Sequence, residues 1–411
     1  MLKNENKYLF KFAWKNIQQN PGRSVFIGLS VCLAVVLAVW VVSFFDGLDH
    51  QIEQAVVNTN TGYFQIQEPL FSKTTDSSKP LALTDALKEK LSQKPYKGYS
   101  PELVLDGNIS TPEGATGLVV LGIDPAIQKS FLPISKSIIS GEFIHSKDDY
   151  SVVIGQELAS FFKFHVGDTF VLNYQDVKGE LRSEILSIKG IYHYNSKSFE
   201  KKFIYINQKT WQTIFLNQYN GQILFNRIPV MTENLSSEFE VKKQFENQNL
   251  VIKSWKQLNP EMAVVLEFHN GMIKFFLIII GITITMTIMT PVQMLWQERL
   301  RELKMMNILG ISSRKFWKIG LFEVIQMILL SSSFSILCLT IIIGVQSQTG
   351  VDFRFLNDGV SIERAGIKLP GIIYPKLMGE QIYFTLLFVC MVLMISYCWS
   401  IHRTLKKLGE N

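Results

Sequence analysis

Cysteine is scarce in this sequence, and its longest polar region has none. The chain has only four cysteines among 411 residues, and all of them lie in or next to long apolar runs: Cys32, Cys338, Cys390 and Cys398. Residues 46–274 contain no cysteine. This absence excludes disulfide bonds and cysteine-based metal sites from that region.

Signatures of catalysis and of nucleotide binding are also missing. The sequence has no G-x-x-x-x-G-K-[ST] loop, whose backbone would cradle nucleotide phosphates, so we do not expect this chain to bind ATP. It has neither H-E-x-x-H nor G-x-S-x-G, and its six histidines show no metal-ligand spacing. We therefore predict no catalytic residue, no metal site and no cofactor in this chain.

Charged residues are absent from four long windows, although 18% of the whole sequence is charged. The windows are 24–45, 275–297, 324–344 and 382–401. A helix rises 1.5 Å per residue, so about 20 apolar residues cross the hydrocarbon core of a bilayer. The sequence therefore predicts four transmembrane helices. The first window follows a long basic leader and lacks a small-x-small cleavage pattern, so we expect an uncleaved span rather than a signal peptide.

Lysine and arginine beside the windows predict the orientation of the chain. They concentrate in the leader before residue 24, in the link 298–318 and in the tail 402–411. The positive-inside rule then puts these segments and both termini in the cytoplasm, and puts 46–274 and 345–381 outside. The net charge of +6 is thus mostly a topology signal, and we expect no nucleic-acid partner.

The predicted fold class is a membrane protein, with four transmembrane α-helices and a large α+β extracytoplasmic domain inserted between spans 1 and 2. In that domain, GYFQIQ, LVLDGNIS and TGLVVLGI have the character of strands, and LTDALKEKLSQ is typical of a helix capped by Thr84. From Glu261 we expect one helix that continues into the second span; a linker at Asn270 and Gly271 is the alternative. In the leader, Leu9, Phe12, Ala13 and Ile17 predict one apolar helix face.

Several stretches, spread along the chain, carry a resemblance to a known family. They are FAWKNIQQNPGRSVFIGLSV, LGIDP, VVIGQELASFFKFHVGDTFVL and QERLRELKMMNILGISSRKFWKIGLFE. Together with the hydropathy, they resemble ABC-transporter permeases of the MacB, LolC/LolE and FtsX type (type VII), and lipoprotein-releasing permeases most closely. The resemblance implies a multi-pass protein of the bacterial inner membrane, here in a Gram-negative cell, with its large domain in the periplasm.

With that resemblance, the chain divides into nine predicted segments. They are an amphipathic cytoplasmic helix over 1–23, the first span over 24–45, a MacB-like periplasmic domain over 46–274, the second span over 275–297, a cytoplasmic coupling helix and link over 298–318, the third span over 319–344, a periplasmic loop over 345–381, the fourth span over 382–401 and a cytoplasmic tail over 402–411.

The resemblance also implies that the stretch after the second span contacts separate ATPase subunits, which would bind ATP and Mg. The implied coupling residues are Glu298, Arg299, Arg301, Glu302, Leu303, Met306, Leu309 and Gly310. Taken alone, these charges could be simple positive-inside flanks. The two glutamates favour the coupling role, because orientation does not require them.

The outer halves of spans 1 and 2 are expected to line a pocket for an acylated substrate. The candidate residues are Val39, Val42, Phe44, Phe45, Met272, Phe275 and Phe276; plain lipid contact is the alternative for each. The expected partners are a second copy or a homologous permease, a lipoprotein or another hydrophobic substrate, membrane lipid, and a periplasmic chaperone or adaptor.

The implied function is extraction of lipoproteins from the inner membrane for release toward the outer membrane. Two alternatives remain: MacB-like mechanotransmission efflux with an adaptor and an outer-membrane channel, and FtsX-like regulation of cell-wall hydrolases without transport. One feature departs from the lipoprotein-release pattern. The link NYQDVKGELRS is short and polar, whereas one subunit of release systems carries a long hairpin there that recruits a chaperone.

Overall fold

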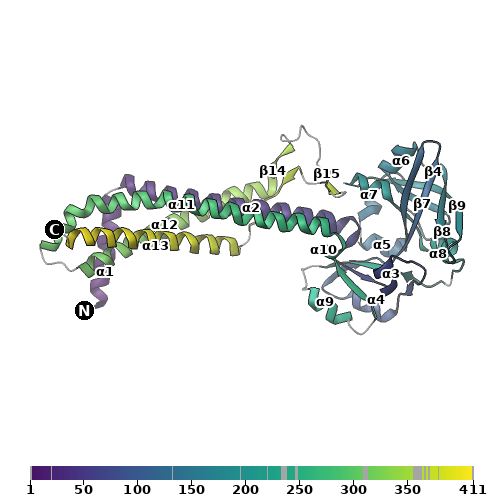
Figure 1. Cartoon of the computed structure of the whole chain (residues 1–411), viewed down its shortest axis with the longest axis horizontal. Helices are drawn as coiled ribbons and strands as arrows, with labels where there is room; N and C mark the ends of the chain where they lie inside the picture. The colour runs from purple at the N-terminus through teal and green to yellow at the C-terminus, as the bar shows by residue number, and fades with distance from the viewer. Residues whose placement is uncertain are drawn as a thin grey trace. The chain divides into compact units, whose positions relative to one another are not determined.

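The computed structural model describes residues 2–409, apart from Asn20, Leu132, Asn195, Asn220, 233–237, 246–248, 309–312, 355–362, 365–366, 369–370 and Met378. The chain forms two compact units (Figure 1). The helical unit comprises Met1–His50, Leu266–Leu356 and Gly371–Asn411, and the outer unit comprises Gln51–Val265 and Asn357–Pro370.

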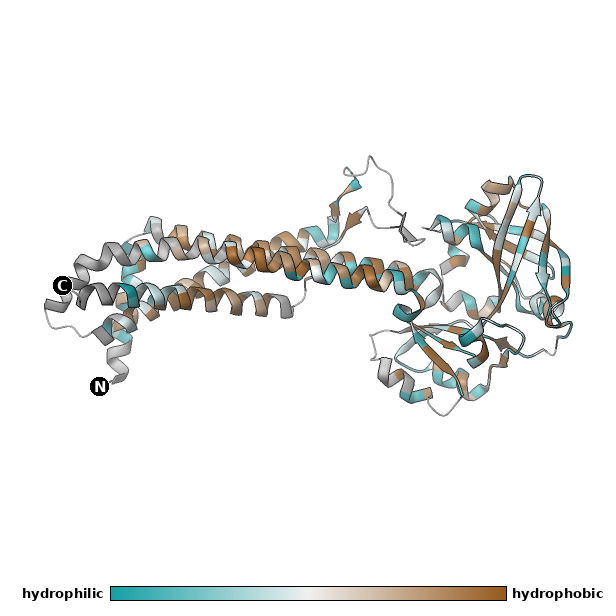
Figure 2. Ribbon diagram, in the orientation of Figure 1, coloured by the Kyte–Doolittle hydropathy of each residue, from teal (hydrophilic) through white to brown (hydrophobic). Residues whose placement is uncertain are grey.

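Five helices build the helical unit: α1 (Leu2–Gln19), α2 (Pro21–Val56), α11 (Pro260–Ile308), α12 (Ser313–Thr349) and α13 (Gly379–Gly409). Among the described residues, four helical stretches are long and apolar enough to cross a membrane: Ser24–Thr59, Pro260–Thr283, Trp317–Thr349 and Ile382–Ser400. Figure 2 shows the apolar character of these helices. Where each span begins and ends within its helix stays a prediction.

The expected unbroken helix into the second span is confirmed. Helix α11 begins at Pro260, a favourable first helical residue because proline has no N–H to leave unpaired. It continues through Asn270 and Gly271, so the alternative linker at that point is wrong. The leader is also helical: α1 ends at Gln19 and α2 begins at Pro21.

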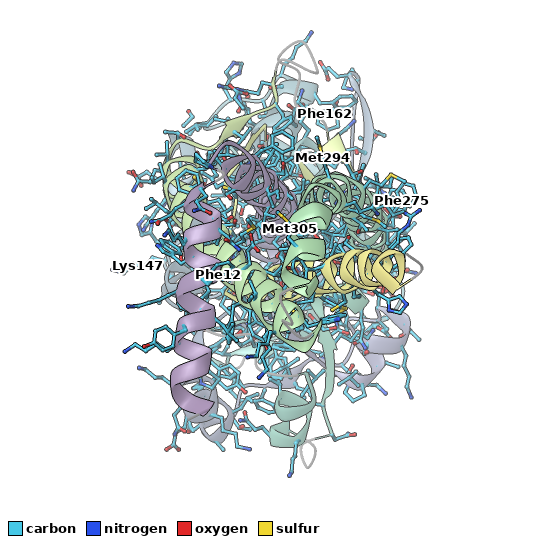
Figure 3. All side chains as sticks on the ribbon, turned by 90° about the vertical axis from the view of Figure 1, so that its left-hand side faces the viewer. Phe12, Lys147, Phe162, Phe275, Met294 and Met305 are labelled. Carbon is cyan, nitrogen blue, oxygen red and sulfur yellow. The ribbon has the colours of Figure 1, made fainter. Side chains whose placement is uncertain are left out.

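Helix α1 packs on α12 through most of the predicted face, with Phe10 as an added contact. The rings of Phe10 and Phe322 meet edge to face with centroids 5.8 Å apart, and the Gln326 side-chain amide donates to the Phe10 carbonyl. Ala13 and Ile17 are buried as expected, but Phe12 is exposed (Figure 3). The predicted stripe is therefore right at Ala13 and Ile17 and wrong at Phe12, and the Phe10 ring reaches α12 although it is itself 44% exposed.

The outer unit is organised around a mixed sheet of eleven strands with the order β13-β1-β12-β4-β5-β10-β7-β9-β6, in which β3 pairs with β12 and β8 pairs with β4 and β9. Its strands are β1 (Phe64–Gln67), β3 (Tyr96–Tyr99), β4 (Glu102–Thr111), β5 (Gly114–Ile123), β6 (Ile138–Gly141), β7 (Ser151–Gly155), β8 (Thr169–Gln175), β9 (Leu181–Tyr192), β10 (Phe203–Asn207), β12 (Arg227–Thr232) and β13 (Val251–Ser254). Among the described strands of this sheet, only the β5–β10 and β7–β9 pairings are parallel.

Short helices cover this sheet: α3 (Pro69–Thr74), α4 (Asp85–Ser92), α5 (Pro125–Phe131), α6 (Gln156–Phe162), α7 (Lys197–Lys202), α8 (Gln208–Leu216), α9 (Glu238–Phe245) and α10 (Trp255–Leu258), with a π-helical turn at Val57–Thr61 and a 3₁₀ turn at Pro133–Lys136. Small two-stranded ribbons pair β2 (Leu81–Ala82) with β11 (Leu224–Phe225), β14 (Val351–Asp352) with β17 (Ile372–Ile373), and β15 (Glu363–Arg364) with β16 (Ile367–Lys368). The predicted strands and the Thr84 cap are confirmed: the Thr84 hydroxyl accepts from the Leu87 N–H at 3.3 Å.

The outer unit has two lobes, visible as two masses in Figure 1. The base lobe contains residues 57–100 and 225–258, with β1, β3, β12 and β13 packed on α4 and α9. The inserted lobe contains residues 102–224, whose sheet has one apolar core on each face, and Phe71 of α3 in the base lobe packs into the second of these cores. Trp211 fills one core and Tyr205 the other, and both are fully buried.

Candidate functional site

The predicted ATPase-coupling stretch forms the end of α11. Residues 298–306 are helical and continuous with the second span, and α11 ends at Ile308. Leu309 and Gly310 lie outside the described residues. The expected coupling helix is therefore not a separate element, because no glycine or proline interrupts residues 292–308. In this stretch Met305 is exposed, as Figure 3 shows. Contact with an ATPase stays a prediction.

Four of the seven predicted substrate-pocket residues meet in an aromatic cluster within the helical unit. Phe45 of α2 stacks on Phe276 of α11 with centroids 6.5 Å apart, and Phe44 and Phe275 each contact one of these rings. The full cluster consists of Trp40, Phe44, Phe45, Phe275, Phe276 and Phe353. It lies at the C-terminal end of the first apolar window and the N-terminal end of the second.

The other three predicted pocket residues are placed differently. Val39 is fully buried in the core of the helical unit, together with Val35 and Leu393. Val42 and Met272 are half-buried. Val39 thus packs the bundle and does not line an open pocket, because its side of α2 is already covered by α12 and α13.

A polar pair that the sequence interpretation missed lies beside this cluster. Asp49 of α2 and His269 of α11 approach to 2.8 Å between Oδ1 and Nδ1, and each side chain is only 18% exposed. The spacing of the histidines along the sequence shows no metal-ligand pattern and does not reveal this pair. The position of His269 in a helix next to an apolar window was the available signal. Among the described residues, no three His, Cys, Asp or Glu side chains are grouped so as to hold a metal ion.

An apolar pocket of about 710 Å³ lies between α2, α11 and α13. Its walls are Ala38, Leu277, Ile278, Ile280, Gly281, Ile282, Thr285, Met286, Met289, Phe384, Thr385 and Phe388. Gly281 allows close approach of α13, because a Cβ there would lie 3.1 Å from the Phe388 ring. The Thr285 hydroxyl donates to the Gly281 carbonyl at 2.7 Å and is satisfied within its own helix. The pocket is therefore suited to a hydrocarbon group.

None of the predicted pocket residues lines this cavity. The sequence placed the pocket at the ends of spans 1 and 2, whereas the cavity uses the middle of α11 and the first turns of α13. The contribution of Phe384 and Phe388 depends on which helices pack together, and the sequence pattern of α13 alone does not specify that.

The sequence model of one family, the MacB-like periplasmic core domain, matches residues 24–248, which is more than half of the 411-residue chain. The chain belongs to the MacB/FtsX-type family of ABC-transporter permeases. Permeases of this family are not ATPases themselves and work with ABC ATPase partners. The apolar helices and the family together indicate a bacterial inner-membrane protein.

Solved structures of related domains are similar at low identity. The periplasmic region of MacB from Actinobacillus actinomycetemcomitans is 10% identical with a TM-score of 0.33, over 50% of this chain and 95% of that one. The extracellular domain of the noncanonical ABC-type transporter YknZ from Gram-positive bacteria is 12% identical with a TM-score of 0.31, over 47% and 98%. No curated protein matches.

In this permease the link between β8 and β9 is a tight hairpin. The Asp176 carboxylate accepts from the backbone N–H groups of Lys178 and Glu180 and from Arg182 Nε at 2.6 Å. Burial alone would raise the pKa of Asp176, but these donors, Arg182 foremost, hold it below its ordinary value. Gly179 turns the chain with a φ of +81°. The link is therefore short and internally satisfied.

Proposed function

We propose that this chain is the permease subunit of a lipoprotein-release ABC transporter, with both termini in the cytoplasm, and that it extracts lipidated proteins from the inner membrane. The observation that carries the proposal is the apolar pocket between α2, α11 and α13. Its volume of about 710 Å³ falls within the range of roughly 300–1,000 Å³ that is typical of small-ligand sites.

The chemistry of the pocket favours an acyl chain as the bound group. Burying a polar group without a hydrogen-bond partner is costly, and the walls are almost entirely hydrocarbon. A saturated acyl chain has no polar group that needs a hydrogen-bond partner, and it would contact Met286, Met289 and Phe388. The aromatic cluster of Phe45 and Phe276 supplies further apolar surface on the same two helices, α2 and α11.

Helix α11 supports a mechanical link between this pocket and an ATPase. It carries pocket residues from Leu277 to Met289 and continues through 298–306 to Ile308. We propose that separate ATPase subunits bind ATP and Mg, that they press on residues 298–310, and that α11 transmits the displacement. The subunit would pair with a second copy or a homologous permease.

A second candidate function is MacB-like efflux with a periplasmic adaptor and an outer-membrane channel. The tight β8–β9 hairpin favours it, because the Asp176–Arg182 turn leaves no long arm for recruiting a chaperone. Under the lipoprotein-release function, this chain would instead be the partner subunit that lacks such an arm.

Depletion of the protein in its host, followed by membrane fractionation and mass spectrometry of lipoproteins, tests the proposal. We expect lipoproteins to accumulate in the inner membrane. Normal lipoprotein sorting would contradict release and favour efflux. A photo-crosslinking residue in place of Met286 should capture lipoproteins, whereas the same residue in place of Met294, which is exposed but outside the pocket walls, should not.

A Glu302→Lys variant tests the coupling role separately. We expect the assembled transporter to keep its subunits but to lose most of its lipoprotein release, because a charged contact with the ATPase would be reversed. Arg403→Glu, a charge reversal in the cytoplasmic tail, is the matched control and should release lipoproteins normally.

A further inference from the structure

The two lobes of the outer unit are joined by two adjacent chain crossings. The chain enters the inserted lobe between Ser100 and Glu102, where β3 ends and β4 begins. It returns between Leu224, whose side chain packs on a core of the inserted lobe, and Phe225, which is in the core of the base lobe. The Asn226 N–H donates to the Glu102 carbonyl at 3.0 Å, so the crossings lie side by side.

The sheet is continuous across the lobes through one residue pair. Strands β12 and β4 are paired only at Arg227 and Glu102. Beyond this pair, β12 continues in the base lobe beside β1 and β3, and β4 continues in the inserted lobe beside β5 and β8. A sheet joined by a single pair resists bending at that point far less than a full ladder does.

A buried ion pair links the two crossings. Arg227 Nε donates to Glu102 Oε2 at 2.8 Å, and the Glu102 side chain is fully buried while that of Arg227 is 12% exposed. Close by, the Ser100 hydroxyl donates to Gln128 Oε1 of α5, another contact between the lobes. Asn226 adds a third link, because its Oδ1 accepts from the Val104 N–H at 2.7 Å.

The polar groups at this junction are incompletely paired. Glu102 Oε1, Gln128 Nε2 and Tyr205 Oη are buried without a hydrogen-bond partner among the described residues. Burial raises the pKa of Glu102, and Arg227 and the Ser100 hydroxyl oppose that effect. Burial also raises the pKa of Tyr205, which the charge of Glu102 raises further and that of Arg227 lowers. Unpaired buried polar groups favour any rearrangement that lets water reach them.

We propose that the inserted lobe swings on the base lobe about these two crossings, and that the Glu102–Arg227 pair is a buried clasp that holds the described arrangement. Opening breaks the clasp and the Ser100–Gln128 contact, and it hydrates the unpaired atoms of Glu102, Gln128 and Tyr205. It must also break the Tyr194 hydroxyl bond to the Asn58 carbonyl at 2.8 Å, the pairing of β2 with Leu224 of β11, and the packing of Phe71 on the core around Tyr205. Closing restores these contacts. The fully buried layers on either side of the junction, around Trp211 and Phe225, move as rigid bodies because their packing is complete.

Spin-label distance measurements on the full-length protein in nanodiscs test this hinge. With the four native cysteines replaced by alanine, the labels are placed at Asp85→Cys of the base lobe and Leu181→Cys of the inserted lobe, both exposed. We expect one narrow distance distribution with the clasp intact. Arg227→Gln should add a second distance population above about 10% of molecules, more than a minor conformer usually reaches.

Two further variants make the test decisive. Lys209→Gln removes an exposed ion pair with Asp149 inside the inserted lobe, and it should leave the distribution narrow. Ser100→Cys with Gln128→Cys, oxidised to a disulfide, should return the Arg227→Gln protein to one narrow population. A folded Arg227→Gln protein that keeps a single narrow distance would overturn the proposal.

If Arg227→Gln prevents folding, the cysteine pair is introduced into the chain with an intact clasp. Hydrogen exchange at Glu102, Leu103 and Asn226 should then slow on oxidation, because locking the lobes suppresses opening. Exchange that is equal in the oxidised and reduced proteins would contradict a hinge at this point.

Discussion

The two units bury their apolar residues in opposite ways. In the outer unit, Trp211 and Leu103 are completely buried between the sheet and its helices. In the helical unit, Met286 is 69% exposed and Phe275 is 61% exposed, although both stand in apolar helices (Figure 2). The outer unit closes its core by itself in water, whereas the helical unit leaves a surface that hydrocarbon or a neighbouring chain must cover.

The units also satisfy polar side chains differently. In the helical unit, hydroxyls of Ser335 and Ser400 donate to carbonyls four residues earlier in the same helix. In the outer unit, Asn226 and Val104 are bonded across 122 residues of sequence. Polar contacts of the outer unit therefore help define its tertiary fold. Those of the spans are mostly local, with Gln326–Phe10 and Asp49–His269 among the exceptions that join two helices.

The largest expected difference between the units comes from shortening one apolar side chain in each. Trp211→Ala leaves a cavity in a closed core and should lower the free energy of unfolding by about 3–5 kcal/mol. Met286→Ala should change it by less than about 0.5 kcal/mol, because surface positions tolerate truncation. Denaturant unfolding in nanodiscs, followed by circular dichroism, measures both. Equal losses would contradict the contrast between closed and open packing.

Within the outer unit, two glycines differ in how closely other backbone atoms approach them. A Cβ on Gly155 would lie 2.2 Å from the Glu200 carbonyl oxygen, whereas one on Gly167 would meet nothing within 4 Å. Gly155→Ala should therefore cost about 3 kcal/mol, the upper part of the usual range for overpacking. Gly167→Ala should cost about 1 kcal/mol, since only its φ of +97° is unfavourable for alanine. Proteolytic susceptibility of the outer unit would rank the two, and the reverse order would contradict the geometry.

A similar pair of glycines tests packing in the helical unit. A Cβ on Gly320 of α12 would lie within 2.0 Å of the Tyr397 hydroxyl of α13, whereas Gly344 has open space. Gly320→Ala should lower stability by about 1–2 kcal/mol, because Tyr397 must shift. Gly344→Ala should be neutral or slightly stabilising, since alanine favours helix. Thermal aggregation in detergent compares the two proteins; identical midpoints would show that α12 and α13 are not held by this contact.

Local sequence patterns predicted several strands and helices of the outer unit. The pairing of strands that are far apart in sequence could not be predicted. Apolar strand patterns identified β1, β4 and β5, and a hydroxyl before a helical pattern identified the cap at Thr84. The parallel pairing of β5 with β10 depends on residues far apart in sequence. Strand β12 was missed because it is short and contains Pro229, which usually argues against a strand inside a sheet.

In the candidate site, too, the residues grouped by local pattern were predictable and those grouped by helix packing were not. Four aromatic residues could be grouped from the sequence because they lie where the first apolar window ends and the second begins, and the two spans pack side by side there. They are Phe44, Phe45, Phe275 and Phe276. The Asp49–His269 pair and the Phe384 and Phe388 walls could not, because they require the rotation of each helix about its axis. Uniformly apolar helices give little periodic signal for that rotation.

The smallest expected effect concerns the cap of α4, a purely local feature of the outer unit. Thr84→Ala removes the acceptor for the Leu87 N–H and should lower stability by about 1 kcal/mol, whereas Thr84→Ser keeps the hydroxyl and should cost much less. Hydrogen exchange of the Leu87 and Lys88 amides measures the loss of stability in the first turn of α4, where the cap is removed. Because α4 packs in the base lobe through Leu87 and Leu91, faster exchange should stay within that lobe. Equal acceleration in β8 and β9 would mean that the two lobes unfold together, and that the rigid bodies on either side of the junction are not independent.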